Sequence, residues 1–84
     1  MNKPLRFTVH AQTVVSERGL EVAWIEDAVF NPDWTEIDPS GPPLERRYRR
    51  IEERDGRILR VICLEDADEI RIITAFLDRK AQKP

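Results

Sequence analysis

Residues 57–77 read RILRVICLEDADEIRIITAFL, and this stretch decides the fold. Two runs rich in Ile, Val and Leu, residues 57–64 and 70–77, flank a short acidic segment. Apolar and β-branched residues at this density favour strands that are packed on at least one face. The stretch therefore predicts an antiparallel hairpin at the centre of the structure.

The preceding segment extends this hairpin to three strands. Residues 46–54 read RRYRRIEER and lead into an Asp-Gly pair, one of the strongest short signals for a hairpin turn. A strand over 46–54 that pairs with 57–64 is the prediction, with a charged helix as the alternative. Because side chains alternate along a strand, Arg47 and Arg49 are expected on one face and Tyr48 on the other.

The N-terminal third predicts one short strand and two helices. Residues 5–8 form the candidate strand, and the hydroxyl of Thr8 is well placed to cap a helix over 9–18. Gly19 ends that helix as a left-handed glycine followed by an apolar residue. A second helix fits 21–30, where apolar residues recur at helical spacing.

The segment between helices and strands is rich in proline. Residues 31–45 hold four of the six prolines and are interpreted as a loop or a ragged edge segment, and residues 79–84 as a frayed tail. The element order β-α-α-β-β-β over a single domain, 1–84, predicts an α+β fold with two N-terminal helices packed on a small antiparallel sheet. In the last strand, strict alternation places Phe76 on the same side as Ile72 and Ala75 on the opposite side.

Composition predicts a small soluble domain. The chain has 84 residues, of which 40% are hydrophobic and 36% charged, with a net charge of −2. Residues 1–45 carry three bases against eight acids, a net charge of −5, whereas residues 46–84 carry eleven bases against eight acids, a net charge of +3. The absence of a signal-peptide core or a membrane-length apolar run, together with a single cysteine, Cys63, predicts a cytoplasmic protein that does not associate with membranes.

Few residues are candidates for chemistry. His10, the single histidine, lies in the expected first helical turn and is either a catalytic base or a half-buried structural residue. Arg18, two helical turns later, is a phosphate ligand or a partner of a nearby acid. One histidine and one cysteine give no zinc spacing, and no acidic run matches a calcium loop, so no metal and no cofactor are expected.

The run of residues 46–50, RRYRR, is the most distinctive charge feature. An aromatic side chain between guanidinium groups can bind single-stranded RNA through stacking and phosphate contacts. An edge strand protected from aggregation by its charge has the same pattern. The residues alone leave both interpretations open.

The order of several short motifs carries a family resemblance. FTVHA, SERGL, a helix ending in NPD, RRYRRI, GRILRVI and IRIITAFLDRK follow one another over residues 6–80. In this order they resemble the bacterial family called domain of unknown function 4258. That family is distantly similar to the BrnT and RelE/ParE toxins of toxin–antitoxin pairs, small α+β proteins of which many are ribonucleases.

This resemblance implies a RelE/BrnT-like fold and a metal-independent endoribonuclease. It implies that His10 acts as acid or base and that Arg60 stabilises the phosphate in catalysis. The substrate-binding candidates are Arg18, Arg47, Tyr48 and Arg49, with the tyrosine as the stacking platform. The implied partners are RNA and an antitoxin-like protein.

A non-enzymatic interaction or dimerisation module on the same fold is the alternative. Val14 occupies a position, one helical turn after His10, where members of the resembled family often have a base. Apolar residues on both sides of the last strand leave a second face that a partner protein or a second copy in a homodimer could cover.

Overall fold

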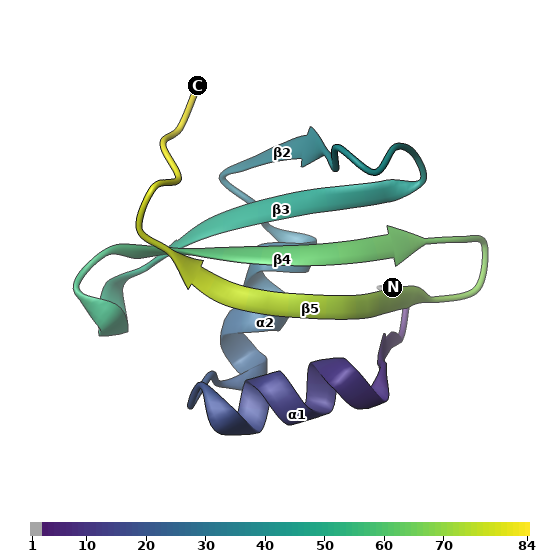
Figure 1. Ribbon diagram of the computed structural model, residues 1–84, viewed down its shortest axis with the longest axis horizontal. Helices are drawn as coiled ribbons and strands as arrows, with labels where there is room; N and C mark the ends of the chain where they lie inside the picture. The colour runs from purple at the N-terminus through teal and green to yellow at the C-terminus, as the bar shows by residue number, and fades with distance from the viewer. Residues whose placement is uncertain (1–2) are drawn as a thin grey trace.

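The computed structural model describes residues 3–84 as a five-stranded sheet with two helices against one face (Figure 1). The face without helices is called the open face below, and the other the helix face. In chain order the elements are β1 (Leu5–Phe7), α1 (Val9–Glu17), α2 (Val22–Phe30), β2 (Trp34–Ile37), β3 (Leu44–Ile51), the 3₁₀ turn η1 (Glu52–Arg54), β4 (Arg57–Glu65) and β5 (Ile70–Asp78).

The strand order β1-β5-β4-β3-β2 confirms the α+β class and corrects two details. A strand, β2, which the predicted element order lacks, lies within segment 31–45 and pairs antiparallel with β3 at the edge of the sheet. The prolines of that segment flank this four-residue strand and leave its backbone donors intact. The sheet is also mixed, because β1 pairs parallel with β5 after the chain crosses behind the sheet through both helices.

The central hairpins follow the sequence pattern with one shortened strand. β3 pairs antiparallel with β4, and β4 with β5. β3 ends at Ile51, and residues 52–54, predicted as strand, form η1. Asp55 and Gly56 have φ angles of 58° and 73°, the left-handed geometry that an Asp-Gly turn provides.

Both ends of α1 are built as the sequence predicts. The Ala11 amide donates to Thr8 Oγ1 at 3.1 Å, which caps the helix. Gly19 has a φ of 63°, and the Leu20 amide reaches back to the Val15 carbonyl at 3.0 Å. Neither α1 nor α2, each nine residues long, combines the length and apolar character needed to cross a membrane.

The core lies between the helix face and the two helices. Its residues of zero exposure come from α1, α2, β4 and β5 and are Ala11, Ile25, Ala28, Leu59, Val61, Cys63, Ile72 and Ala75. Burial of this apolar surface supplies the main stabilising free energy of the fold.

A β-bulge in β5 overturns the predicted alternation. Cys63 pairs with Ile72 whereas Ile62 pairs with Thr74, so Ile73 is an extra residue in β5. Ile72 and Ala75 therefore both lie in the core, although strict alternation placed them on opposite sides. The bulge also brings Phe76 to the open face, where it pairs with Arg60.

Candidate nucleic-acid interface

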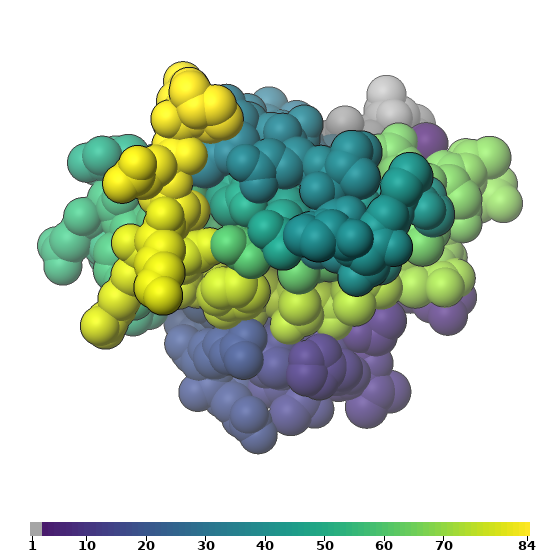
Figure 2. All heavy atoms as spheres, turned by 45° about the horizontal axis from the view of Figure 1, so that its top comes forward, coloured from purple at the N-terminus to yellow at the C-terminus, as the bar shows by residue number. Residues whose placement is uncertain are grey.

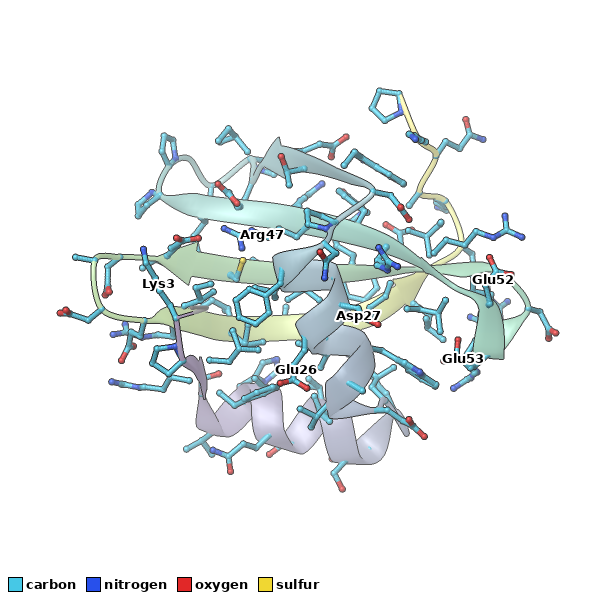
Figure 3. The ribbon with its side chains drawn as sticks, turned by 180° about the vertical axis from the view of Figure 1, so that it is seen from behind. Lys3, Glu26, Asp27, Arg47, Glu52 and Glu53 are labelled. Carbon is cyan, nitrogen blue, oxygen red and sulfur yellow. The ribbon has the colours of Figure 1, made fainter. Side chains whose placement is uncertain are left out.

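Arg47 and Arg49 lie on the helix face and cap the C-terminal end of α2. The Arg47 guanidinium donates to the Val29 carbonyl at 2.9 Å, and that of Arg49 to the Asn31 carbonyl at 2.6 Å. The last carbonyls of a helix have no partner within it and carry the negative end of its dipole. These two arginines satisfy that end of α2, and Figure 3 shows Arg47 on this side of the sheet.

Two carboxylates hold Arg47 further. Its side chain is 11% exposed and donates to Glu45 at 2.8 Å and to Glu65 at 2.7 Å. Arg47 therefore has three protein acceptors and little surface left for a ligand. The predicted alternation of residues 46–50 is confirmed, and it separates Arg47 and Arg49 from Tyr48.

A stacked row crosses the open face through directly paired residues of four strands. It consists of Trp34 on β2, Tyr48 on β3, Arg60 on β4 and Phe76 on β5. The Trp34 and Tyr48 rings stack with centroids 4.5 Å apart and planes 7° from parallel. The Arg60 guanidinium lies 5.5 Å from the Tyr48 centroid and 4.9 Å from that of Phe76. Of the predicted site residues, Tyr48 and Arg60 are therefore neighbours.

Acidic residues anchor this row. Arg60 forms an ion pair with Asp78 at the end of β5, and the Tyr48 hydroxyl donates to Glu36 at 2.9 Å. Burial, followed by this bond to Glu36, raises the pKa of Tyr48 above its ordinary value of 10.0. Tyr48 is 2% exposed, so its ring offers no free face for a base.

Arg18 joins the same row from α1. Its guanidinium donates to the Ala75 carbonyl at 2.7 Å and lies 5.9 Å from the Phe76 centroid. The short strand β1 pairs only with residues 70–72 of β5, so the carbonyl of Ala75 lies at a free edge of the sheet. Arg18 covers that edge and carries positive charge to it.

Arg18 also lines a pocket with two further arginines. This arginine pocket has a volume of about 280 Å³ and is lined by Arg18, Leu20, Arg54, Arg57, Phe76 and Leu77. Within residues 3–84 none of its three arginines forms an ion pair, whereas six other arginines do. No acid lines the pocket, so three positive charges converge on one concave surface of a protein with net charge −2.

The turn before β4 positions two members of this pocket that the sequence left unassigned. Arg54 ends η1 and lies 5.8 Å from the ring centroid of the buried Trp24, and Arg57 begins β4. Both arginines flank the Asp-Gly turn, and this position is the one sequence feature that could have identified them as members of the pocket. The sequence predicts that residues 52–54 continue the strand. They form η1 instead, and this turn places Arg54 in the same pocket as Arg18.

His10 lies apart from these groups. It is exposed in the first turn of α1, and its side chain forms no hydrogen bond within the described residues. A helical rise of about 1.5 Å per residue separates it from Arg18 by roughly 12 Å along the axis. The structure therefore does not bring His10 together with the arginine pocket.

Cys63 is a packed thiol of the core. It has zero exposure, and burial raises its pKa to about 11. The thiolate, which is the reactive form, is accordingly disfavoured at neutral pH.

The short sequence motifs follow one another over residues 6–80, which is most of the chain. No curated protein and no solved structure matches it. The model of one family, the domain of unknown function DUF4258, matches residues 7–77. The chain therefore belongs to the DUF4258 family.

Proposed function

We propose that the protein binds single-stranded RNA through the arginine pocket. The observation that carries this proposal is the convergence of Arg18, Arg54 and Arg57, none of them paired with a carboxylate within residues 3–84. A guanidinium matches the geometry of a phosphate through two parallel hydrogen bonds. Leu20, Phe76 and Leu77 supply apolar surface beside these donors, against which a ribose or base can pack.

Titration of a fluorescent RNA oligomer at several salt concentrations tests this proposal. Arg54→Met and Arg57→Met are each expected to weaken binding and to reduce the dependence of log K on log salt by about 0.7 for each phosphate that the variant no longer neutralises. Arg6→Met is the matched control, because Arg6 is exposed, lies outside the pocket and removes the same charge. Equal losses of affinity in all three variants, or no binding by the parent protein, would reject a localised RNA site.

RNA cleavage is the finer part of the proposal and depends on His10. Cleavage requires a base near the ribose 2′-hydroxyl, and the distance between His10 and Arg18 means that one RNA would have to span about 12 Å of α1. Incubation of RNA with the protein and with His10→Ala, together with growth after induced expression, separates the two activities. Cleavage and growth arrest that both disappear in His10→Ala support a toxin-like ribonuclease, whereas intact RNA bound by the parent protein supports binding alone.

A second candidate function is protein association through the edge of β2. β2 pairs on one side only, and Ile37 at its end is 59% exposed. An unpaired strand edge can accept a strand from another chain, either a protein partner or a second copy. Sedimentation of the parent protein and of Ile37→Lys tests this function, which requires a dimer or complex that the variant does not form.

A further inference from the structure

A second concave surface lies on the open face, at the other end of the stacked row. This polar hollow has a volume of about 280 Å³, and the residues that matter here are Trp34, Glu36, Arg46, Tyr48, Arg60 and Lys80. Lys80 belongs to the C-terminal tail, which leaves the end of β5 and passes the start of β2 (Figures 1 and 2). The hollow is therefore made by three adjacent strands and walled by the tail.

Two of the side chains that line this hollow each carry an N–H donor that lacks an acceptor within the described chain. Trp34 Nε1 and Arg60 Nε are both buried and form no hydrogen bond there. Arg60 donates to Asp78 through a terminal nitrogen, and its Nε–H forms no hydrogen bond within the described chain. Buried donors without acceptors are costly and uncommon, so a small side-chain rotation that turns either donor toward an acceptor in the hollow would be favourable.

The hollow also contains an acceptor. Glu36 is exposed, and of its two carboxylate oxygens only Oε1 is engaged within residues 3–84, by the Tyr48 hydroxyl. Arg46 and Arg60 are already paired with Asp38 and Asp78, which leaves Lys80 to face the carboxylate of Glu36. Glu36 disfavours a phosphate, which carries acceptors and negative charge only. A group with donors and an acceptor side by side fits the combination of Glu36, Trp34 and Arg60.

We infer that the polar hollow reads a guanine base. The Watson–Crick edge of guanine presents two adjacent donors, N1–H and N2–H, which one carboxylate can accept together, and O6 beside them. Glu36 supplies the carboxylate, and Trp34 Nε1 or Arg60 Nε supplies the donor to O6. This inference rests on the RNA binding proposed above and adds a base preference to it.

The stacked row connects the two surfaces. Arg60 contacts the ring of Phe76 from the hollow side, and Arg18 approaches the same ring from the arginine pocket. A strand of RNA that places a phosphate among the arginines therefore meets the open face across Phe76. In such a complex the phosphate contacts position the strand, and the base contacts specify its sequence.

Nucleosides test the hollow alone, because they carry no phosphate for the arginine pocket. The probe is the indole N–H resonance of Trp34 in ¹⁵N-labelled protein, assigned by its loss in Trp34→Phe. Guanosine is expected to shift this resonance in a saturable way, inosine less because it lacks the N2 amino group, and adenosine, cytidine and uridine little. Glu36→Gln is expected to abolish the preference for guanosine. Equal shifts with all five nucleosides, or no shift with any, would overturn the inference.

RNA oligomers separate this inference from the RNA-binding proposal. A uridine oligomer with one guanosine is expected to bind on the order of tenfold more tightly than the all-uridine oligomer. Arg57→Met should weaken binding of both oligomers and keep their ratio, whereas Glu36→Gln should bring the ratio towards one. If the parent protein binds both equally, the base preference is wrong while RNA binding stands. If it binds neither, the RNA proposal fails, and the nucleoside titration alone decides whether the hollow binds guanine.

Discussion

Leu59 and Arg60 are consecutive residues of β4, and their surroundings differ completely. Leu59 has zero exposure in the core beneath the helices. Arg60 lies on the open face between the rings of Tyr48 and Phe76. The two helices cover the helix face, whereas the open face is covered only in part, by the side chains of the stacked row.

The arginines near the helices differ from one another in a further way, in the number of protein partners that each one has. On the helix face Arg47 and Arg49 are engaged by helix carbonyls, and Arg47 by two carboxylates as well. In the arginine pocket Arg54, which lies against Trp24 of α2, and Arg57, which shares a side of β4 with Leu59, have no ion pair within residues 3–84. Arginines close together in sequence therefore divide into a group that stabilises the fold and a group available to a ligand.

The largest expected effect distinguishes the two faces by stability. Leu59→Ala removes a fully buried side chain and is expected to lower the free energy of unfolding by about 3 kcal/mol, or the melting temperature by roughly 15 °C. Ile62→Ala is the matched variant on the same strand, at a half-buried position, with an expected loss of about 1 kcal/mol. Urea unfolding monitored by circular dichroism measures both. Similar losses would show that the open face is as closed as the helix face.

The second prediction distinguishes the two groups of arginines. Arg47→Met leaves the Val29 carbonyl and Glu45 without this donor and Glu65 with Lys3 alone, and is expected to cost about 2 kcal/mol of unfolding free energy. Arg54→Met removes a guanidinium that no acceptor within residues 3–84 holds, so a change within about 0.5 kcal/mol is expected. Thermal melts of the two variants make the measurement. An RNA affinity that falls more in Arg47→Met than in Arg54→Met, in folded protein, would reverse the assignment of the two groups.

Local chemistry accounts for the parts of this fold that the sequence predicts. Thr8 as a helix cap, Gly19 as a helix end and the Asp-Gly turn each depend on the conformational preference of one or two residues. The central hairpin depends on the apolar and β-branched density of residues 57–77. These signals are independent of the rest of the chain, and the structure contains all of them.

The parts that the sequence did not predict depend on tertiary contacts. β2 is four residues long and exists because it pairs with β3, and the bulge at Ile73 exists in the register between β4 and β5. The roles of Arg47 and Arg49 depend on where α2 ends relative to β3, a relation between segments that no local pattern encodes. The arginine pocket likewise joins the segment that follows α1 with η1, β4 and β5, and of its residues only Arg18 was a candidate from the sequence.

The smallest expected effect is a pH dependence that belongs to the helix face. Hydrogen bonds from Arg47, and then from Lys3, hold the pKa of Glu65 below its ordinary value of 4.5. The unfolded state therefore binds the proton more readily than the folded state near that pH, so stability falls as the pH drops below about 4.5 through the folded pKa. Because Glu65 is 38% exposed, the contribution is expected to be less than about 1 kcal/mol. Glu65→Gln should flatten this part of the stability profile from pH 6 to pH 3, whereas Glu26→Gln, which removes a carboxylate outside any ion pair in the described chain, should leave it intact. Identical slopes in the two variants would show that the contacts of Arg47 to carboxylates add nothing to stability, and the carbonyls at the end of α2 would then account for its role alone.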